Sequence, residues 1–278
     1  MSGLAGRIRE AIADRRLGPR MWLYSNYHCN LACRYCLTGS SPRSERRALD
    51  AGVMLALAEE GAELGFAGLG VTGGEPFLRP DMPALLAGLS QVLPVVVLTN
   101  GTVFRRERIA RLEPMRGARV TLQISLDSAQ PDRNDAFRAP GNFARVVDAI
   151  PRLLERGHRV RVATTLAQEP DGGDLEGLAD LVRGLGVPPE DHVVREAVAR
   201  GRAADEGLGA AVGVDDLPAE PTWTADGLFW SPFAPTVRGA GLQTDLLVSR
   251  RLLPAAAGMT AFMSLLGDEP AGDAGRFT

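Results

Sequence analysis

Residues 21–36 read M-W-L-Y-S-N-Y-H-C-N-L-A-C-R-Y-C, an apolar run followed closely by three cysteines. The apolar residues 21–25 predict a buried strand. Cys29, Cys33 and Cys36 follow it with the spacing C-x3-C-x2-C. In α/β barrels the chemistry is carried by loops at the carboxyl ends of the strands. The stretch therefore predicts a strand of an α/β domain that leads directly into a cysteine-bearing site.

The rest of the chain repeats the alternation of short apolar runs with longer amphipathic runs as far as about residue 203. We expect strands at residues 21–25, 67–72, 95–99, 119–126, 159–166 and 192–198, and helices at 50–64, 82–92, 105–112, 143–156 and 175–185. Strands rich in Val, Ile, Leu and Thr are typical of parallel sheets buried on both faces, and the alternation implies right-handed βαβ units. Six strands favour a partial (β/α)6 TIM-like barrel over the closed eight-stranded form.

Composition divides the chain into three parts. Residues 1–18 are expected to form an N-terminal helical segment, and residues 19–203 the barrel core. Residues 204–278 are rich in Gly, Ala and Pro, with strand-like pieces near 222–230 and 242–248. We expect this part to be a short C-terminal extension with a weakly ordered tail after about residue 267.

The charged residues restrict the classes of function. A net charge of -3 argues against a nucleic-acid partner, which normally requires a basic surface. Apolar runs of transmembrane length are absent, and the charged N-terminus is unlike a signal peptide, so we expect a cytoplasmic protein with no membrane partner. All 31 basic residues are arginine, which excludes a Schiff base or a P-loop on lysine.

The cysteines are more informative than the charges. All three lie within eight residues, which is unlike a disulfide framework and favours a metal or redox site. Three thiolates can hold three irons of a four-iron cluster, whose complete ligation takes four cysteines. The remaining iron would be open to a substrate or cofactor. A zinc site on the three cysteines and His28 is an alternative, although His28 adjoins Cys29 and zinc sites favour paired C-x2-C motifs.

With the aromatic Tyr35 before its last cysteine, the motif resembles the signature of the radical S-adenosylmethionine (SAM) superfamily. The resemblance implies one [4Fe–4S] cluster on Cys29, Cys33 and Cys36, with SAM chelated by the open iron. It also implies that reductive cleavage of SAM gives methionine and a 5′-deoxyadenosyl radical, which abstracts hydrogen from the substrate. A flavodoxin or ferredoxin is implied as electron donor, and the backbone of Tyr35 is implied to meet the adenine.

A second motif follows the second expected strand, where Gly73, Gly74, Glu75 and Pro76 read G-G-E-P. Two glycines let the backbone approach a ligand closely, although a tight turn is the alternative interpretation. The motif resembles the part of the radical SAM family that binds the methionyl ammonium of SAM.

The third and fourth expected strands end in polar residues. Asn100 lies in L-T-N-G-T, and Ser125 and Asp127 lie on one face of I-S-L-D-S, followed by Arg138. This stretch resembles the peptide-modifying and sulfatase-maturing branch, in which the strand serine and the later arginine meet the SAM carboxylate or ribose. An Asn-Gly turn for Asn100 and a surface ion pair for Arg138 are the alternatives.

Further candidates lie on the last two strands. Thr164, Thr165 and Gln168 close the fifth strand, and Arg195 and Glu196 lie in the sixth. Asp127, Arg195 and Glu196 are candidates for substrate contact. Threonines are also common fillers of strands.

The C-terminal extension resembles a shortened SPASM-type domain, in which cysteines bind auxiliary clusters. Trp230-Ser231-Pro232 stands where such cysteines are expected, and no cysteine follows Cys36. Trp223, Phe229 and Trp230 are expected to cap the barrel or to contact the substrate.

The sequence leaves the substrate open between a peptide and a small metabolite. We expect the short N-terminal segment to hold no domain that binds a leader peptide, so that a peptide substrate would need a separate partner. A non-catalytic scaffold on the same fold and a zinc-stabilised α/β protein are the alternatives from other classes.

Overall fold

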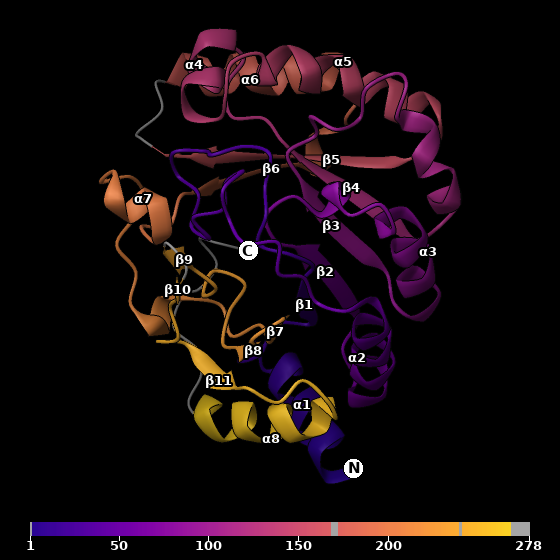
Figure 1. Ribbon diagram of the computed structural model, residues 1–278, viewed down its shortest axis with the longest axis vertical. Coiled ribbons are helices and arrows are strands. Elements are labelled where there is room, and N and C mark those ends of the chain that lie inside the picture. The colour runs from indigo at the N-terminus through magenta and orange to yellow at the C-terminus, as the bar shows by residue number, and fades with distance from the viewer. Residues whose placement is uncertain (1, 168–171, 239–240, 268–278) are drawn as a thin grey trace.

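The computed structural model describes residues 2–167, 172–238 and 241–267 (Figure 1). Gln168 and the tail expected after residue 267 lie outside the described residues.

The core is a curved sheet whose first six strands are parallel and neighbour one another in sequence order. They are β1 Arg20–Tyr24, β2 Gly68–Thr72, β3 Val95–Thr99, β4 Val120–Ser125, β5 Arg159–Leu166 and β6 His192–Glu196. The predicted parallel α/β architecture is therefore confirmed. Parallel pairing in sequence order brings the carboxyl ends of all six strands to one edge, where the predicted site residues lie.

Helices α2 Ala51–Leu64, α3 Met82–Val92, α4 Pro131–Phe137, α5 Asn142–Glu155 and α6 Gly172–Gly184 connect the strands and lie on the outer face of the sheet (Figure 1). Helix α2 is capped at its start by Asp50, whose carboxylate accepts a hydrogen bond from the Val53 N–H, and at its end by Gly65 with φ of 103°. These local signals explain why the boundaries of α2 lie within one residue of those predicted.

The prediction of a helix at residues 105–112 is wrong. A 3-10 helix, η2, spans Ile109–Met115 instead and contains Pro114, which has no N–H to donate to an α-helical ladder. Helix α4 was not predicted, although Pro131 at its first position is a helix-start signal.

The C-terminal part of the chain extends the same sheet. Strand β7 Thr222–Thr224 pairs in parallel with β1, β8 Gly227–Phe229 pairs antiparallel with β7, and β11 Leu247–Ser249 pairs antiparallel with β8. The sheet thus ends at β11 and β6, and the described residues contain no pairing between these two strands. This open edge makes the barrel partial, as predicted. Strands β9 Val237–Arg238 and β10 Gly241–Leu242 form a separate ribbon.

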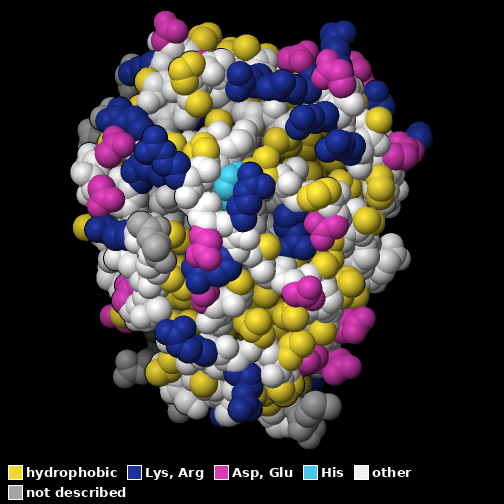
Figure 2. All heavy atoms as spheres, viewed as in Figure 1, with side chains coloured by type: hydrophobic (Ala, Val, Ile, Leu, Met, Phe, Trp, Pro, Cys, Tyr) yellow, Lys and Arg dark blue, Asp and Glu magenta, His cyan; other side chains and the backbone are white. Residues whose placement is uncertain are grey.

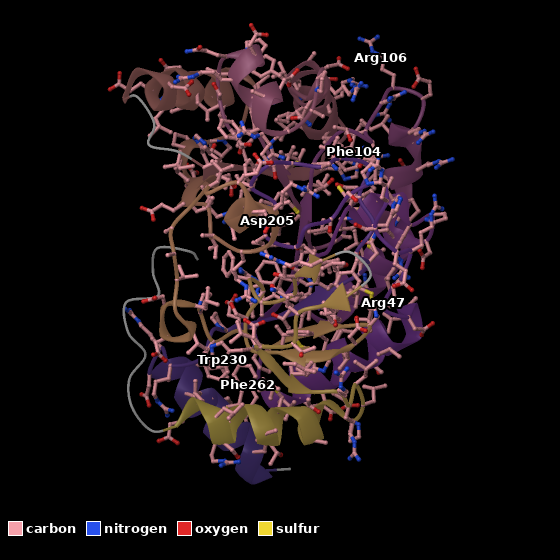
Figure 3. The ribbon with its side chains drawn as sticks, turned by 60° about the vertical axis from the view of Figure 1, so that its left-hand side comes forward. Arg47, Phe104, Arg106, Asp205, Trp230 and Phe262 are labelled. Carbon is pink, nitrogen blue, oxygen red and sulfur yellow. The ribbon has the colours of Figure 1, made fainter. Side chains whose placement is uncertain are left out.

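Helices α1 Ser2–Ala13 and α8 Ala255–Leu266 pack together at the end of the molecule that is at the bottom of Figure 1. Trp230 stacks on Phe262 of α8, with ring centroids 4.6 Å apart and planes 10° apart (Figure 3). Trp223 and Phe229 are fully buried. Trp223 and Trp230 therefore join the core cluster that includes Phe262 of α8, and none of the three aromatic residues lines the cavity described below.

The surface mixes both signs of charge. On the face shown in Figure 2, basic and acidic side chains are interspersed, and every basic one is an arginine because the sequence has no lysine. Among the described residues, no helix has the length and apolar character needed to cross a membrane.

Candidate functional site

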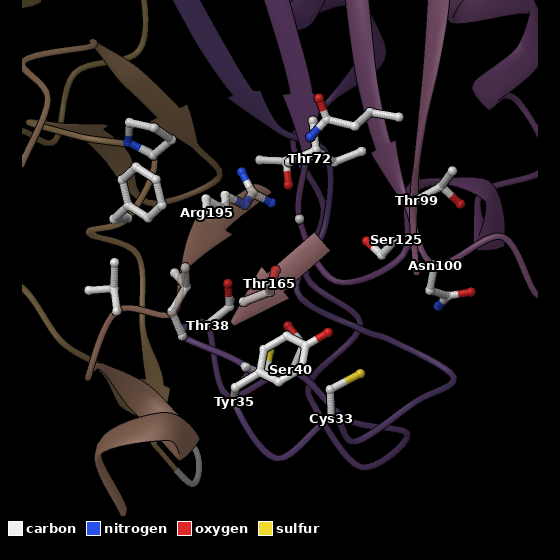
Figure 4. Close-up of a pocket in the computed structure, with 18 of the residues that line it drawn as sticks. Cys33, Tyr35, Thr38, Ser40, Thr72, Thr99, Asn100, Ser125, Thr165 and Arg195 are labelled. Atoms are coloured by element: carbon white, nitrogen blue, oxygen red, sulfur yellow. The ribbon is translucent and has the colours of Figure 1, made fainter. Parts of the chain in front are cut away.

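A cavity of about 260 Å³ lies inside the open barrel (Figure 4). Most of the residues singled out in the sequence line it: Cys29, Cys33, Tyr35, Cys36, Gly73, Gly74, Asn100, Ser125 and Arg138. Glu75, Pro76 and Asp127 are not among its lining residues. The fold thus brings together the ends of β2, β3 and β4 and the loop after β1 that carries Cys29, Cys33 and Cys36, which we call the cysteine loop. The motif spacing predicted this arrangement.

The three thiols form part of one wall. Cys29 is buried, and its Sγ accepts hydrogen bonds from the Leu31 N–H at 3.4 Å and from Asn100 Nδ2 at 3.7 Å. Burial raises the pKa of Cys29 to about 12 and that of Cys33 to about 11. Metal-binding cysteines must lose their protons, so iron bound here would have to displace the protons of Cys29 and Cys33.

The donor set fits an iron–sulfur cluster. Three cysteines line one cavity, and the Leu31 N–H and Asn100 Nδ2 donate hydrogen bonds to the sulfur of Cys29. Hydrogen bonds to sulfur help to set the reduction potential of iron–sulfur clusters. Among the described residues, no three His, Cys, Asp or Glu side chains converge closely enough to hold a single metal ion.

The glycine pair after β2 lies directly beneath the cysteine loop. The Gly74 N–H donates to the Asn26 carbonyl at 2.8 Å, and the Glu75 N–H donates to the His28 carbonyl at 3.0 Å. A Cβ on Gly74 would lie 2.1 Å from the His28 oxygen, and Gly73 has a φ of 143°. The cysteine loop can lie this close only because both residues lack side chains.

Glu75 joins the ends of two strands. Its fully buried carboxylate accepts hydrogen bonds from the Thr99 hydroxyl and the Asn100 N–H, both at 2.8 Å, and from the Phe77 N–H at 3.1 Å. Burial raises the pKa of Glu75 to about 7, although these three donors oppose the rise. The Glu75 carboxylate therefore binds groups of the protein itself, while the two preceding glycines line the cavity.

Asn100 links the end of β3 to the cysteine loop. Its Nδ2 donates to Asn30 Oδ1 at 3.0 Å, Asn30 Nδ2 donates to Thr102 Oγ1 at 2.9 Å, and the Thr102 N–H donates to Asn100 Oδ1 at 3.0 Å. This closed set holds Asn100 beside Cys29. Asn30 and Thr102 were not identified from the sequence.

Arg138 and Asp127 form a buried ion pair, so the alternative of a surface pair is excluded. Arg138 Nε and Nη2 donate to the two oxygens of Asp127 at 2.6 and 3.1 Å, and Tyr35 donates its hydroxyl proton at 2.5 Å. Burial alone would lower the pKa of Arg138, but the attraction of Asp127, Tyr35 and Cys33 and the hydrogen bonds to Asp127 together raise it. Burial also raises the pKa of Tyr35 well above its ordinary range. All three side chains are thereby fixed beside Cys33.

Arg202, in helix α7 Gly201–Asp205, holds the cysteine loop from its other side. Its guanidinium donates to the carbonyls of Cys33 at 2.6 Å, Ser40 at 2.9 Å and Gly39 at 3.0 Å. The sequence shows only an arginine-rich stretch after the sixth strand, which does not reveal this contact.

The C-terminal part of the chain supplies another wall. The Tyr24 hydroxyl donates to the Pro232 carbonyl at 2.8 Å, the Val237 N–H donates to the Thr38 carbonyl at 2.8 Å, and Pro232 lines the cavity. Of the candidates on the last two core strands, Thr165, Arg195 and Glu196 line the cavity. Thr164 is buried and donates to the Leu126 carbonyl at 2.8 Å, so it belongs to the packing of the sheet.

The fold and the site together define a class: an α/β partial barrel whose cavity is lined by three cysteines. The model of the Radical SAM superfamily matches residues 23–182, more than half of the chain. The chain therefore belongs to the radical SAM superfamily, whose members are enzymes.

Several known proteins are similar to this chain. The antilisterial bacteriocin subtilosin biosynthesis protein AlbA of Bacillus subtilis is 30% identical over 182 residues, which are 63% of this chain and 39% of AlbA. The GTP 3′,8-cyclase of Syntrophomonas wolfei is 29% identical over 162 residues, 56% of this chain and 48% of the cyclase. The chain thus spans about half or less of the length of these relatives.

The fold also resembles solved structures. The crystal structure of Streptococcus suis SuiB bound to the precursor peptide SuiA matches with a TM-score of 0.60 and 16% identity, over 76% of this chain and 47% of SuiB. A SuiB structure bound to S-adenosylmethionine matches with a TM-score of 0.56 and 16% identity, over 68% of this chain and 43% of SuiB. At these identities the likeness concerns the fold.

Proposed function

We propose that this chain holds one [4Fe–4S] cluster on Cys29, Cys33 and Cys36 and binds SAM at the iron that no cysteine ligates. The observation that carries the proposal is that the only three cysteines of the chain line one cavity together with Gly73 and Gly74. The number of clusters follows from the cysteine count, since every further cysteine-ligated cluster would need thiols that this chain lacks.

When bound, the cluster and SAM supply a 5′-deoxyadenosyl radical that abstracts hydrogen from the substrate. The chain's own residues bind and orient the cofactor. The backbone beside Gly73 and Gly74 accepts from the methionyl ammonium, with Glu75 and Pro76 fixing this turn. Asn100 and Ser125 contribute polar groups on the neighbouring strands.

Arg138 approaches the SAM carboxylate with the donor that Asp127 leaves free. Nε and Nη2 of Arg138 bind Asp127, so Nη1 is available to a ligand in the cavity. Asp127 acts as the residue that orients Arg138 and Tyr35, and the backbone of Tyr35 meets the adenine.

The substrate we favour is a peptide, with a small metabolite as the alternative. AlbA is named for the biosynthesis of a bacteriocin, and SuiB has been crystallised with a precursor peptide, whereas another relative is a GTP cyclase. The reaction also needs an electron, for which we propose a flavodoxin or ferredoxin. Residues 19–203 would form the catalytic core and residues 204–278 a SPASM-like extension without an auxiliary cluster.

The experiment uses protein purified anaerobically and reconstituted with iron and sulfide. SAM and dithionite are added, and 5′-deoxyadenosine is measured by chromatography. We expect about four irons per chain, a broad absorbance near ~400 nm and formation of 5′-deoxyadenosine. The variant Cys33→Ala should lose both cluster and product. Bound zinc without iron, a cluster that never cleaves SAM, or turnover retained in Cys33→Ala would each contradict the proposal.

A further inference from the structure

Arg195 is a cation without a partner inside the cavity. It lies on β6 opposite Thr165 of β5 and lines the cavity, into which its side chain projects (Figure 4). Among the described residues it makes no hydrogen bond, ion pair or contact with an aromatic ring. The side chain of Arg195 is half-buried, and this burial lowers its pKa.

The other three arginines of the cavity all have partners. Arg138 pairs with Asp127, Arg161 lies 3.6 Å from an oxygen of Asp191, and Arg20 lies over the ring of Trp22 at 5.6 Å. Arg195 therefore differs from every other arginine that lines this space.

Asp127 attracts the charge of Arg195, but no carboxylate among the described residues contacts its guanidinium directly. Asp127 is occupied by Arg138, by the Tyr35 hydroxyl and by the Thr165 N–H. Glu220 accepts a hydrogen bond from Trp22 Nε1 at 2.5 Å. A half-buried cation that no counter-charge contacts directly lowers stability, unless a ligand provides that contact.

Arg195 lies apart from Asn100 and Ser125, two of the residues proposed to bind SAM, although its charge interacts with Arg138. Asn100 and Ser125 stand at the ends of β3 and β4, whereas Arg195 stands on β6 at the open edge of the sheet. Figure 4 shows Arg195 on the opposite side of the cavity from Asn100 and Ser125, and Thr38 and Thr165 line the space on its own side. The wall that carries Arg195 is thus available to the substrate.

We propose that Arg195 binds a carboxylate of the substrate, and that the substrate is a peptide segment with an acidic side chain. This inference rests on the proposed function. A guanidinium offers two parallel donors that match a carboxylate. One unpaired arginine compensates one negative charge, whereas a nucleoside triphosphate would bring several.

The first test measures how fast phenylglyoxal modifies Arg195, by peptide mass spectrometry of the reconstituted holoprotein with SAM bound. The probes are N-acetyl-aspartate amide and, as the uncharged control, N-acetyl-asparagine amide. Inorganic phosphate and GTP are tested in the same way. We expect the aspartate probe to slow modification at least about threefold and the asparagine probe to leave the rate unchanged.

Three outcomes would overturn the inference. Equal rates with both amides would show that no carboxylate binds. Stronger protection by phosphate or GTP would assign the site to a phosphorylated metabolite. Protection by SAM alone, seen by comparing protein with and without SAM, would place Arg195 in the cofactor site.

The second test measures melting temperature and needs no ligand. Arg195→Met keeps the aliphatic stem and removes the unpaired charge, so its Tm should equal or exceed that of the wild type. The comparison variant Arg138→Met breaks a buried pair and should melt several degrees lower. A lower Tm for Arg195→Met would show that the fold itself needs Arg195 and would overturn the inference.

These readouts are independent of catalysis. Formation of 5′-deoxyadenosine by the wild type, measured separately, tests the proposed function. If SAM is cleaved but the aspartate probe does not protect, the substrate inference alone fails. If SAM is never cleaved, the proposed function fails.

Discussion

Asp127 and Arg138 are joined by two hydrogen bonds of 2.6 and 3.1 Å, and their side chains are only 6% and 4% exposed. Asp127 follows β4, and Arg138 directly follows α4, so the pair closes the loop between them. Because Tyr35 donates to the same carboxylate, the pair also anchors the cysteine loop. A single buried carboxylate thus fixes both Arg138 and the loop that carries the cysteines.

The variant Arg138→Gln should be strongly destabilised. It leaves the Asp127 carboxylate buried without its main counter-charge, which costs about 3–5 kcal/mol when one partner of a buried pair is removed. Urea denaturation of the anaerobically purified protein measures the loss. Arg183→Gln is the control, because its pair with Asp180 lies on the surface, and it should change the unfolding free energy by less than about 1 kcal/mol. Equal losses in both variants would contradict the buried pair.

The sequence predicted the parts of the site that depend on neighbouring strands. Cys29, Cys33 and Cys36 and the glycine pair follow adjacent strands, so their meeting at one edge follows from parallel βα order. It did not predict Arg202, whose partners lie more than 160 residues earlier in the chain. A guanidinium that donates to backbone carbonyls leaves no pattern, because every residue has a carbonyl.

The helix expected at residues 105–112 shows a second limit of prediction from the sequence. An amphipathic pattern does not distinguish an α-helix from a 3-10 helix when a proline such as Pro114 removes a backbone donor. Similarly, the motif at residues 73–76 does not reveal what the Glu75 carboxylate contacts. Its three donors come from the turn and from β3, and only the three-dimensional arrangement shows that they occupy it.

The variant Gly74→Ala should displace the cysteine loop. Its Cβ would meet the backbone oxygen of His28 at 2.1 Å, and neither backbone can move without breaking the bonds between the two loops. We expect a loss of about 1–3 kcal/mol in unfolding free energy and a lower iron content after reconstitution. The matched control is Gly184→Ala, at the end of α6, where nothing lies within 4 Å of the new methyl group. Full iron content in Gly74→Ala would show that the loops can separate without cost.

The variant Arg202→Gln should loosen the cysteine loop without touching a cysteine. It removes charge-assisted hydrogen bonds to three carbonyls, each of which contributes about 1.5–3 kcal/mol in favourable cases. We expect faster loss of iron to a chelator, followed by absorbance. Arg34→Gln is the control from the same loop, since Arg34 pairs with Glu206 at the surface. If both variants lose iron at the wild-type rate, Arg202 does not position the loop.

Glu220 should make stability depend on pH. The side chain is 6% exposed, and burial raises its pKa above the ordinary value of 4.5 even though Trp22 donates a hydrogen bond to it. The folded state therefore binds the proton more tightly than the unfolded chain. The stabilisation from this group is complete below pH 4.5 and is lost as pH rises through the raised pKa. Glu220→Gln keeps an oxygen that accepts from Trp22 but cannot titrate, so its stability lacks this decline.

Urea denaturation from pH 4 to pH 8 measures the difference in unfolding free energy between the wild type and Glu220→Gln. We expect this difference to fall steadily above pH 4.5 and then to level off, because the carboxylate is fully ionised in both states at higher pH. The control is Glu113→Gln, which removes a carboxylate from a side chain that is 65% exposed and so accounts for the loss of a surface charge. Parallel curves for the wild type and Glu220→Gln would mean that the Glu220 carboxyl group titrates equally in the folded and unfolded states. Its position beside Trp22 would then be more solvated than the structure shows.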